Sequence, residues 1–393
     1  MSRSVFGDRA VVLYCGLLMS ISAFSVDITL PSFPAMAEGL SARYELIQWT
    51  ITVYMFAAGI AQLLWGSASD RYGRRPILAA GLSIFLVGCL VAALAPSIAV
   101  LLIARAAQGF GAAAAIVSSR AIIRDLFSGE ELARNLALAT AIFAVGPIMA
   151  PLLGAGIALP FGWRAIFGVL AALAAAMLLF LLRMPETIPA ISARSMRPAV
   201  FMERACRLFV HPQSRHFLIL SAVAMSSMLF ILASAPRVYD VEFGISGTVF
   251  AIYFALHGTG IIVGQTANRR LIPAVGTVRA MLIACGVLIL AAALILATAL
   301  AGIANAASTT ALLILFATSY LIVYSNAAAM VLDPHGDIAG FAASFYGFIS
   351  QIGSAVIVSG LVVLAGDSVT AFAATLLAIC IACLGGVWLW IRR

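Results

Sequence analysis

The chain has 393 residues, of which 64% are hydrophobic and only 10% are charged. Soluble domains carry about a quarter charged residues, so this composition indicates an integral membrane protein. The net charge of +8 does not indicate nucleic-acid binding, because the basic residues are spread between apolar runs and form no single patch.

Apolar runs near the length that crosses a bilayer, about 20 residues, recur along the whole chain. They are long, continuous and rich in Leu, Ala and Gly, which predicts helices and excludes a membrane β-barrel. We predict twelve transmembrane helices, at residues 10–33, 46–67, 76–95, 98–122, 135–158, 163–183, 214–235, 246–267, 277–299, 308–331, 338–362 and 369–391.

Orientation is predicted from arginine alone, because all 23 basic residues are Arg. With the N-terminus inside, the outer connections hold only Arg43, Arg164 and Arg237. This asymmetry follows the positive-inside rule and predicts a multi-pass protein of the inner (cytoplasmic) membrane with both termini cytoplasmic. The first apolar run is about twice the length of a signal-peptide core, so we expect an uncleaved first helix.

A polar, arginine-rich connection divides the predicted helices six and six. We predict an N-terminal six-helix bundle at 1–183, a cytoplasmic linker at 184–213 and a C-terminal six-helix bundle at 214–393. A GxxxDR pattern at 66–71 recurs as GxxxNR at 264–269, at corresponding places in the two halves. Such an echo is typical of duplicated transporters, whose halves rock about a central site.

The loop between the second and third spans, residues 66–76, reads GSASDRYGRRP. An aspartate at a helix end, a glycine that permits a tight reversal and nearby arginines can pair across helices in one conformational state. The alternative is that the arginines serve only as topology determinants. The predicted cytoplasmic gating motif comprises Gly66, Asp70, Arg71, Gly73, Arg74 and Arg75.

This loop resembles the most specific signature of the major facilitator superfamily. Two further stretches resemble motifs of that family: RAAQGFG at 105–111, its fourth-helix motif, and GPIMAPLLG at 146–154, a motif associated with antiporters. In the second stretch, small residues at fourfold spacing also allow close helix packing, and prolines loosen the backbone, so simple packing is an equal alternative. The antiporter-motif residues are Gly146, Pro147, Pro151 and Gly154.

Within the superfamily, the chain is most similar to the Bcr/CflA group of drug/proton antiporters. The resemblance rests on residues 27–31, 163–167, 234–239 and 337–340. It implies an all-α protein with two pseudo-two-fold-related bundles that exports amphiphilic antibiotics, such as phenicol- or bicyclomycin-type compounds, in exchange for protons by alternating access. Thr29 departs from the group, which often has an aromatic residue there, and this leaves the substrate preference open.

Asp27 lies near the end of the first apolar run, on a helix face that it shares with Ser20 and Gly16. At 1.5 Å per residue it lies about 10 Å below the outer end, and Arg105 lies at a similar depth of about 13 Å in the fourth span. We predict that Asp27 and Arg105 couple proton and substrate, paired directly or through water. The alternatives are a permanent ion pair for Asp27 and a helix-orienting role for Arg105.

Other polar side chains within the spans are candidates for the substrate cavity. His257 could titrate near neutral pH, although a single histidine among apolar residues is also typical of packing. The candidates are Tyr54, Gln62, Gln108, Tyr239, Tyr253, His257, Tyr324, Asn326 and Gln351.

No nucleophile and base pair, metal-spaced cluster or phosphate loop is present in the sequence, so we predict neither an enzyme nor a metal site. We expect a secondary transporter with no cofactor, no ATP and a proton gradient as its energy source. Expected partners are amphiphilic drug-like compounds, protons and the lipid bilayer, without nucleic acid, and the expected state is a monomer. The alternative is transport of one small metabolite such as a sugar, an organic acid or an amino-acid-like solute.

Overall fold

The computed structural model describes residues 8–188, 198–365 and 368–392, and all regular elements in these ranges are helical. Twelve helices in this part of the chain are long and apolar enough to cross a membrane. The predicted number of spans is therefore confirmed. Helices suit the bilayer because each satisfies its own backbone hydrogen bonds where no water is available.

The first half of the molecule begins with a broken helix. Its elements are α1 (Asp8–Asp27), η1 (Leu30–Ser32), α2 (Phe33–Gly39), α3 (Tyr44–Tyr72), α4 (Arg74–Ala93), α5 (Ile98–Leu126), α6 (Gly129–Phe161) and α7 (Trp163–Leu182). The single span predicted at 10–33 needs correction, because regular helix stops at Asp27 and the segment continues through η1 and α2 to Gly39. Pro31 and Pro34 lack the N–H groups that would continue the helical ladder, and the Thr29 hydroxyl donates to the Val26 carbonyl at 2.8 Å.

The second half repeats this order after a short helix, α8 (Pro198–Val210). Its elements are α9 (Pro212–Phe243), α10 (Gly247–Val275), α11 (Thr277–Leu300), α12 (Ala306–Leu332), η2 (Asp333–Ile338), α13 (Ala339–Ala365) and α14 (Val369–Ile391). Within this half α10 packs on α12, and α11 on α14, as α3 packs on α5, and α4 on α7, in the first half.

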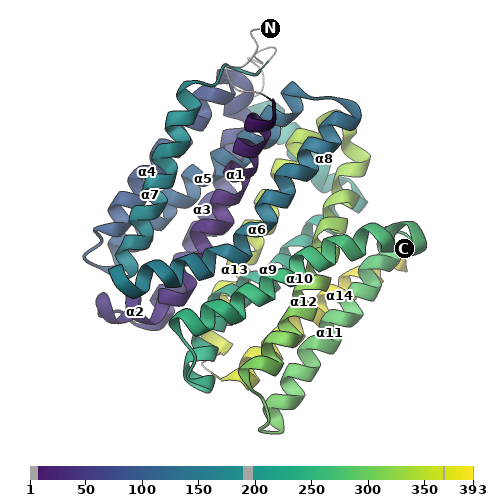
Figure 1. The fold of residues 1–393 in the computed structure, drawn as a ribbon. Helices are drawn as coiled ribbons and strands as arrows, with labels where there is room; N and C mark the ends of the chain where they lie inside the picture. The colour runs from purple at the N-terminus through teal and green to yellow at the C-terminus, as the bar shows by residue number, and fades with distance from the viewer. Residues whose placement is uncertain (1–7, 189–197, 366–367, 393) are drawn as a thin grey trace.

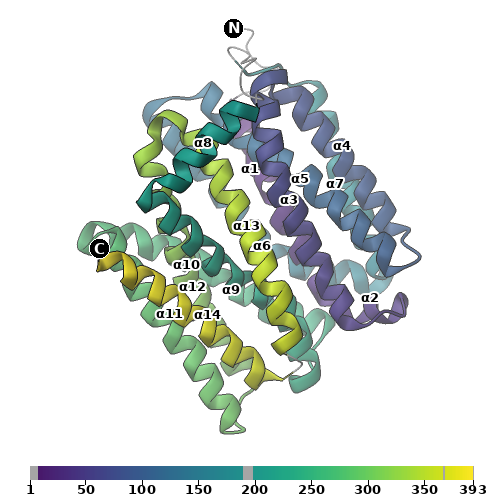
Figure 2. The same ribbon diagram turned by 180° about the vertical axis from the view of Figure 1, so that it is seen from behind.

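The two halves lie side by side and meet along two helix pairs, α3 with α13 and α6 with α10 (Figures 1 and 2). Small residues allow these pairs to approach closely. A Cβ added to Gly59 of α3 would lie 3.1 Å from Ile352 of α13, and one added to Gly258 of α10 would lie 3.0 Å from Ile148 of α6. Each pair therefore combines one helix from each half.

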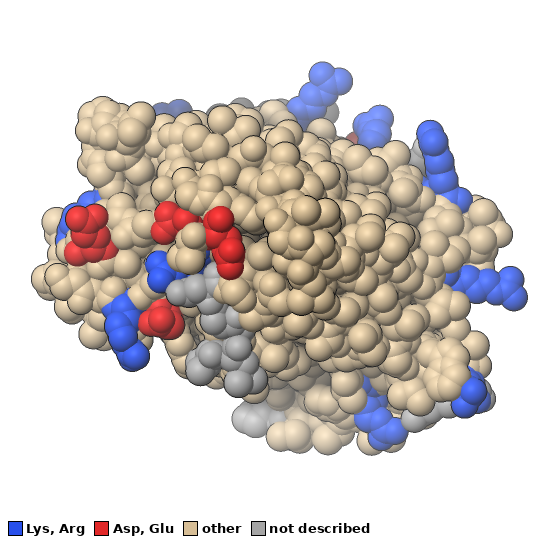
Figure 3. All heavy atoms as spheres, turned by 90° about the horizontal axis from the view of Figure 1, so that it is seen from below, with Lys and Arg blue, Asp and Glu red and all other residues tan. Residues whose placement is uncertain are grey.

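Helix α8 lies within the predicted linker and packs against α13 and α9. Its aromatic residues make edge-on contacts with α13, Phe201 with Phe341 and Phe209 with Phe345, at ring-centroid distances of 5.3 and 5.4 Å. We call the side of the molecule that holds α8 and the Gly73 turn the linker face. Viewed from the opposite side, the surface is largely uncharged, with acidic side chains gathered on one part of it and arginines projecting mainly at its edges (Figure 3).

Candidate functional site

Asp27 is the last residue of α1 and lies directly before the break in the first span. Only 4% of its surface is exposed. Both ion pairs found in the described ranges belong to Arg74, so Asp27 takes part in neither of them. A buried carboxyl group without a charged partner is the kind of intramembrane acid that marks a functional position.

The break after Asp27 lies against helix α6. A Cβ added to Gly154 would overlap the carbonyl oxygen of Ile28, the residue that follows Asp27. Gly154 therefore allows the backbone beside Asp27 to approach α6 closely. The structure thus places one residue of the antiporter motif next to the predicted proton-coupling residue, a proximity that was not predicted.

Arg105 lies on α5 and is 1% exposed. Its Nη1 donates to the carbonyl and hydroxyl oxygens of Ser25, each at 3.2 Å, and to Gln108 Oε1 at 2.8 Å. Its guanidinium lies 4.6 Å from the centre of the Tyr54 ring. Arg105 Nε and Nη2 have no hydrogen-bond partner among the described residues, so two donors are available. The direct form of the predicted Asp27–Arg105 pair is absent from this conformation.

Tyr54 of α3 makes a second contact with α1, and Gln108 of α5 extends the contacts of Arg105 to α4. The Tyr54 hydroxyl donates to Ser22 at 3.3 Å, and Gln108 Nε2 donates to Cys89 Sγ at 3.1 Å. We call Ser22, Ser25, Tyr54, Arg105 and Gln108 the α1–α5 cluster. Ser25 joins this cluster two residues before Asp27 along the same helix, so the cluster reaches α1 close to the buried acid.

Gln62 and Gln351 lie at the α3–α13 contact between the halves. A Cβ added to Gly347 of α13 would overlap Gln62 Oε1, so Gln62 packs against the α13 backbone. Gln351 Oε1 is buried without a hydrogen-bond partner among the described residues. These two predicted cavity residues therefore lie at the boundary between the two halves.

The remaining predicted cavity residues belong to the second half. The Tyr239 and Thr310 hydroxyl groups form a 2.6 Å hydrogen bond. The Tyr239 ring packs against the Tyr253 ring, with the centroids 6.1 Å apart. His257 is 2% exposed, contacts the Phe254 ring and has no hydrogen-bond partner for Nε2 among the described residues.

Tyr324 and Asn326 of α12 lie within other polar contacts. The Tyr324 ring stacks on Tyr320 at 5.8 Å, and its carbonyl accepts a hydrogen bond from Tyr346 at 2.6 Å. Asn326 exchanges two hydrogen bonds with Asn268 of α10, at 3.0 and 3.1 Å. Because both amide groups are engaged, Asn326 joins two helices in this conformation.

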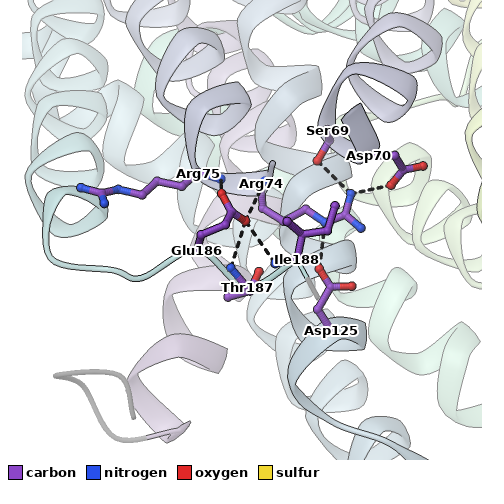
Figure 4. A network of polar contacts seen from close by, with 8 residues as sticks. All are labelled: Ser69, Asp70, Arg74, Arg75, Asp125, Glu186, Thr187 and Ile188. Carbon is purple, nitrogen blue, oxygen red and sulfur yellow. Dashed lines mark hydrogen bonds and ion pairs between the residues drawn. The ribbon is translucent and has the colours of Figure 1, made fainter. Parts of the chain in front are cut away.

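The predicted gating motif forms a charged network on the linker face (Figure 4). Arg74 is its centre: Nη1 donates to Asp70 at 2.6 Å and to Ser69 at 3.1 Å, and Nε donates to Asp125 at 2.8 Å. Gly73 has φ of +100°, a conformation that favours glycine, so α3 can end and α4 begin within one residue. The network therefore connects α3, α4 and α5.

Glu186 caps the start of α4 from the connection after α7. Its two carboxylate oxygens accept the backbone N–H groups of Arg74 and Arg75, at 2.9 and 3.0 Å, and those of Thr187 and Ile188 (Figure 4). Partial burial raises the pKa of this carboxyl group, but the four N–H donors outweigh it and hold the pKa below its ordinary value. Arg75 in addition donates to the Leu182 carbonyl at 2.8 Å.

Several partners in these networks were not predicted as site residues, namely Ser22, Ser25, Asp125 and Glu186. Asp125 follows Arg124 directly at the end of α5, and an acid at a helix end close to basic residues is a detectable signal. Ser22 and Ser25 stand three residues apart and so share one face of the first helix, which is a polar signal, but at 100° per residue this face differs from the one that holds Asp27. Glu186 offers no sequence signal, because its partners are backbone groups.

Residues 15–358 match the family described as the Major Facilitator Superfamily. The uncharacterized MFS-type transporter YdgK of Bacillus subtilis is 34% identical over 65% of this chain, a match that spans 64% of that protein, slightly under two thirds. A bicyclomycin resistance protein homolog of Haemophilus influenzae is 28% identical over 86% of this chain and 85% of its own. A chloramphenicol resistance protein of Pseudomonas aeruginosa is 30% identical over 87% of this chain and 80% of that protein.

Among solved structures, the D-xylose-proton symporter superposes with a TM-score of 0.77 at 14% identity. The match covers 95% of this chain and 97% of that chain. At this identity the likeness concerns the fold, which places the twelve helices in the two six-helix bundles predicted from the sequence.

Proposed function

This chain belongs to the major facilitator superfamily, and from that premise we propose that it exports amphiphilic antibiotics in exchange for protons. Membership makes it a membrane transporter and not an enzyme. The observation that carries the proposal is Asp27, a buried acid with no ion-pair partner among the described residues, at a helix break. The relatives named for bicyclomycin and chloramphenicol resistance support drugs as the exported class.

In the proposed cycle Asp27 binds a proton when the cavity opens to the outside and releases it when the cavity opens to the inside. An ionised carboxylate without a partner is costly in a low-dielectric site, so a proton or a polar group of the drug stabilises it. The two available donors of Arg105 bind acceptor oxygens of the drug, or of Asp27 after a helix shift. Binding of the proton and of the drug are therefore mutually exclusive.

Gly154 transmits the state of Asp27 to the interface between the halves. It contacts Ile28 on one face of α6, while Pro147 and Ile148 of the same helix contact Gly258 of α10. A small shift of the backbone beside Asp27 consequently moves a helix that forms part of the interface. This is the physical link between protonation and the opening of the two halves.

The test uses purified protein in proteoliposomes with an imposed pH gradient and chloramphenicol as the transported compound. We expect Asp27→Asn to abolish gradient-driven transport, and Gly154→Ala to reduce it severely through displacement of Ile28. Asp333→Asn, which neutralises an exposed aspartate, is the matched control and should transport like the wild type. Unchanged proton-driven transport in Asp27→Asn would falsify the carrier role.

A resistance screen in a host that lacks its own exporters distinguishes drug export from transport of one metabolite. We expect expression to raise resistance to several unrelated compounds, and Asp27→Asn to remove that resistance. Accumulation of a single labelled sugar, organic acid or amino-acid-like solute, without drug resistance, would instead support the metabolite alternative.

A further inference from the structure

A cavity of about 130 Å³ opens on the linker face, away from Asp27. Its wall combines both halves and the linker: α3, α4 and α5 from the first half, α8, and α13 from the second half. The lining residues used below are Asp70, Arg74, Arg120, Arg124, Arg204 and Ser344. The volume exceeds the space that a single water needs several times over.

The wall of this cavity carries excess positive charge. Arg74 is already neutralised by Asp70 and by Asp125. Arg120, Arg124 and Arg204 also line the cavity, and none of them forms an ion pair with an acid whose side chain the structure describes. Three guanidinium groups therefore face one space, and the one acid among the lining residues that the structure describes, Asp70, is engaged with Arg74.

The three arginines come from two separate elements, one in the first half and one in the linker. Arg120 and Arg124 lie on α5, whereas Arg204 lies on α8 and stacks over the Phe341 ring of α13 at 5.9 Å. Arg124 also approaches α13, because its Nη1 would lie only 3.1 Å from a Cβ added to Gly340. The absence of a side chain at Gly340 lets this guanidinium reach the other half.

We propose that this cavity is an oxyanion site that takes a phosphate group. The planar guanidinium fork matches two oxygens of a phosphate, and the three positive charges more than offset its double negative charge. The Ser344 hydroxyl adds an uncharged donor from the second half. The phosphate comes either from a soluble anion of the cytoplasm or from the headgroup of an anionic lipid.

A bound phosphate links α5, α8 and α13, so it stabilises the conformation in which the linker face is closed. Anion binding in this cavity therefore opposes opening of the linker face, and the opposition increases with the concentration of the anion. This inference is independent of which compound the protein exports, because Asp27 and the α1–α5 cluster contribute no residue to the cavity wall.

The binding test measures thermal unfolding of the purified full chain in neutral detergent during titration with inorganic phosphate at constant ionic strength. Phosphate should raise the unfolding temperature of the wild type, since a ligand that binds only the native state stabilises it. Arg124→Gln and Arg204→Gln should each weaken the apparent affinity roughly tenfold or more. Arg124→Lys, which keeps the charge but not the fork, should weaken it less and serves if a Gln variant fails to fold.

Arg279→Gln is the matched control, because this exposed arginine at the start of α11 does not line the cavity. An equal loss of affinity in this control would show general charge attraction and overturn the proposal. Absence of any phosphate effect on the wild type would also overturn it.

A second arm identifies the source of the phosphate. The titration is repeated in nanodiscs of phosphatidylcholine, with and without phosphatidylglycerol. Loss of the inorganic-phosphate effect in the presence of phosphatidylglycerol assigns the site to a lipid headgroup, and an unchanged effect assigns it to a soluble anion. Either result supports the site, provided that the stabilising effect of the anion is weakened in Arg124→Gln and in Arg204→Gln.

Discussion

Helices α3 to α5 of the first half correspond to α10 to α12 of the second half. The two sets have the same arrangement of helices and turns, but their helices are joined by different polar contacts. Each has a positive-φ glycine between its first two helices, Gly73 at +100° and Gly276 at +83°. In the first half Arg74 joins two acids. In the second half Asn268 takes the position of Asp70 in the repeated pattern and bonds directly to Asn326.

The position held by Asp70 in the first half and by Asn268 in the second therefore carries a polar contact in both halves, but a charged one only in the first. An amide pair is neutral and insensitive to salt and pH, whereas an arginine between two acids responds to both. The first half therefore holds the contact that can respond to conditions, and the second half holds a constant one. Four predictions test this comparison.

The largest effect is expected for Arg74→Ala, which leaves Asp70 and Asp125 without their shared cation. Removal of one partner from a buried ion pair costs roughly 3 kcal/mol, and we expect a comparable loss in the free energy of unfolding. Thermal unfolding in detergent measures it. Arg71→Ala is the control, because Arg71 stacks over Tyr72 at 5.2 Å and forms no ion pair among the described residues. Equal losses in both variants would contradict the central role of Arg74.

The two acids should differ because they differ in burial. The Asp125 side chain is 8% exposed and that of Asp70 is 44% exposed. We expect Asp125→Asn to cost about 1 to 3 kcal/mol, as for a hydrogen bond to a charged group, and Asp70→Asn less than about 1 kcal/mol. High salt should weaken only the contribution of Asp70. A larger effect at Asp70 than at Asp125 would contradict the link between burial and stabilisation in this network.

A double-mutant cycle of Asn268→Ala and Asn326→Ala should give a coupling free energy of about 1 kcal/mol, the usual contribution of neutral hydrogen bonds. Both residues are nearly buried, at 6% and 2% exposure, so the coupling should not change with salt or between pH 5 and 8. Thermal unfolding of the four variants measures it. A salt-dependent coupling would remove the contrast between the halves.

The smallest effect concerns the Glu186 cap. Its pKa lies below the ordinary value of 4.5, so its stabilisation is present above pH 4.5 and is lost as the pH falls through the lowered pKa. The wild type should therefore lose more thermal stability than Glu186→Gln between pH 5 and 3. Glu203→Gln, at an exposed glutamate of α8, is the control and should follow the wild type. Identical pH profiles for wild type and Glu186→Gln would contradict the cap.

Much of the fold was predictable because bilayer insertion depends on local composition. Twelve apolar runs predicted twelve helices, and the Gly73 reversal follows from a glycine placed between a helix end and a proline at 76. The burial of Asp27 also agrees with its position on a polar helix face. The break after Asp27 was not predicted, although Pro31 and Pro34 are signals of it.

The partners of the charged residues were much less predictable. Similar depth in the membrane suggested that Asp27 and Arg105 meet, but depth along a helix says nothing about direction around its axis. In the structure Arg105 contacts Ser25, Gln108 and the Tyr54 ring instead. The partner of Asn326 was not predicted either. Its residue type suggested a place in the substrate cavity, whereas in the structure it forms hydrogen bonds with Asn268.

The membrane class, the number of spans, their six-plus-six division and the location of the motifs follow from local sequence, because hydropathy and turn chemistry act over a few residues. Helix packing is needed to learn that Gly154 lies against Ile28, that Arg74 joins two acids and that three arginines face one cavity. These contacts join helices from distant parts of the chain, and helix packing, not sequence spacing, sets which side chains meet.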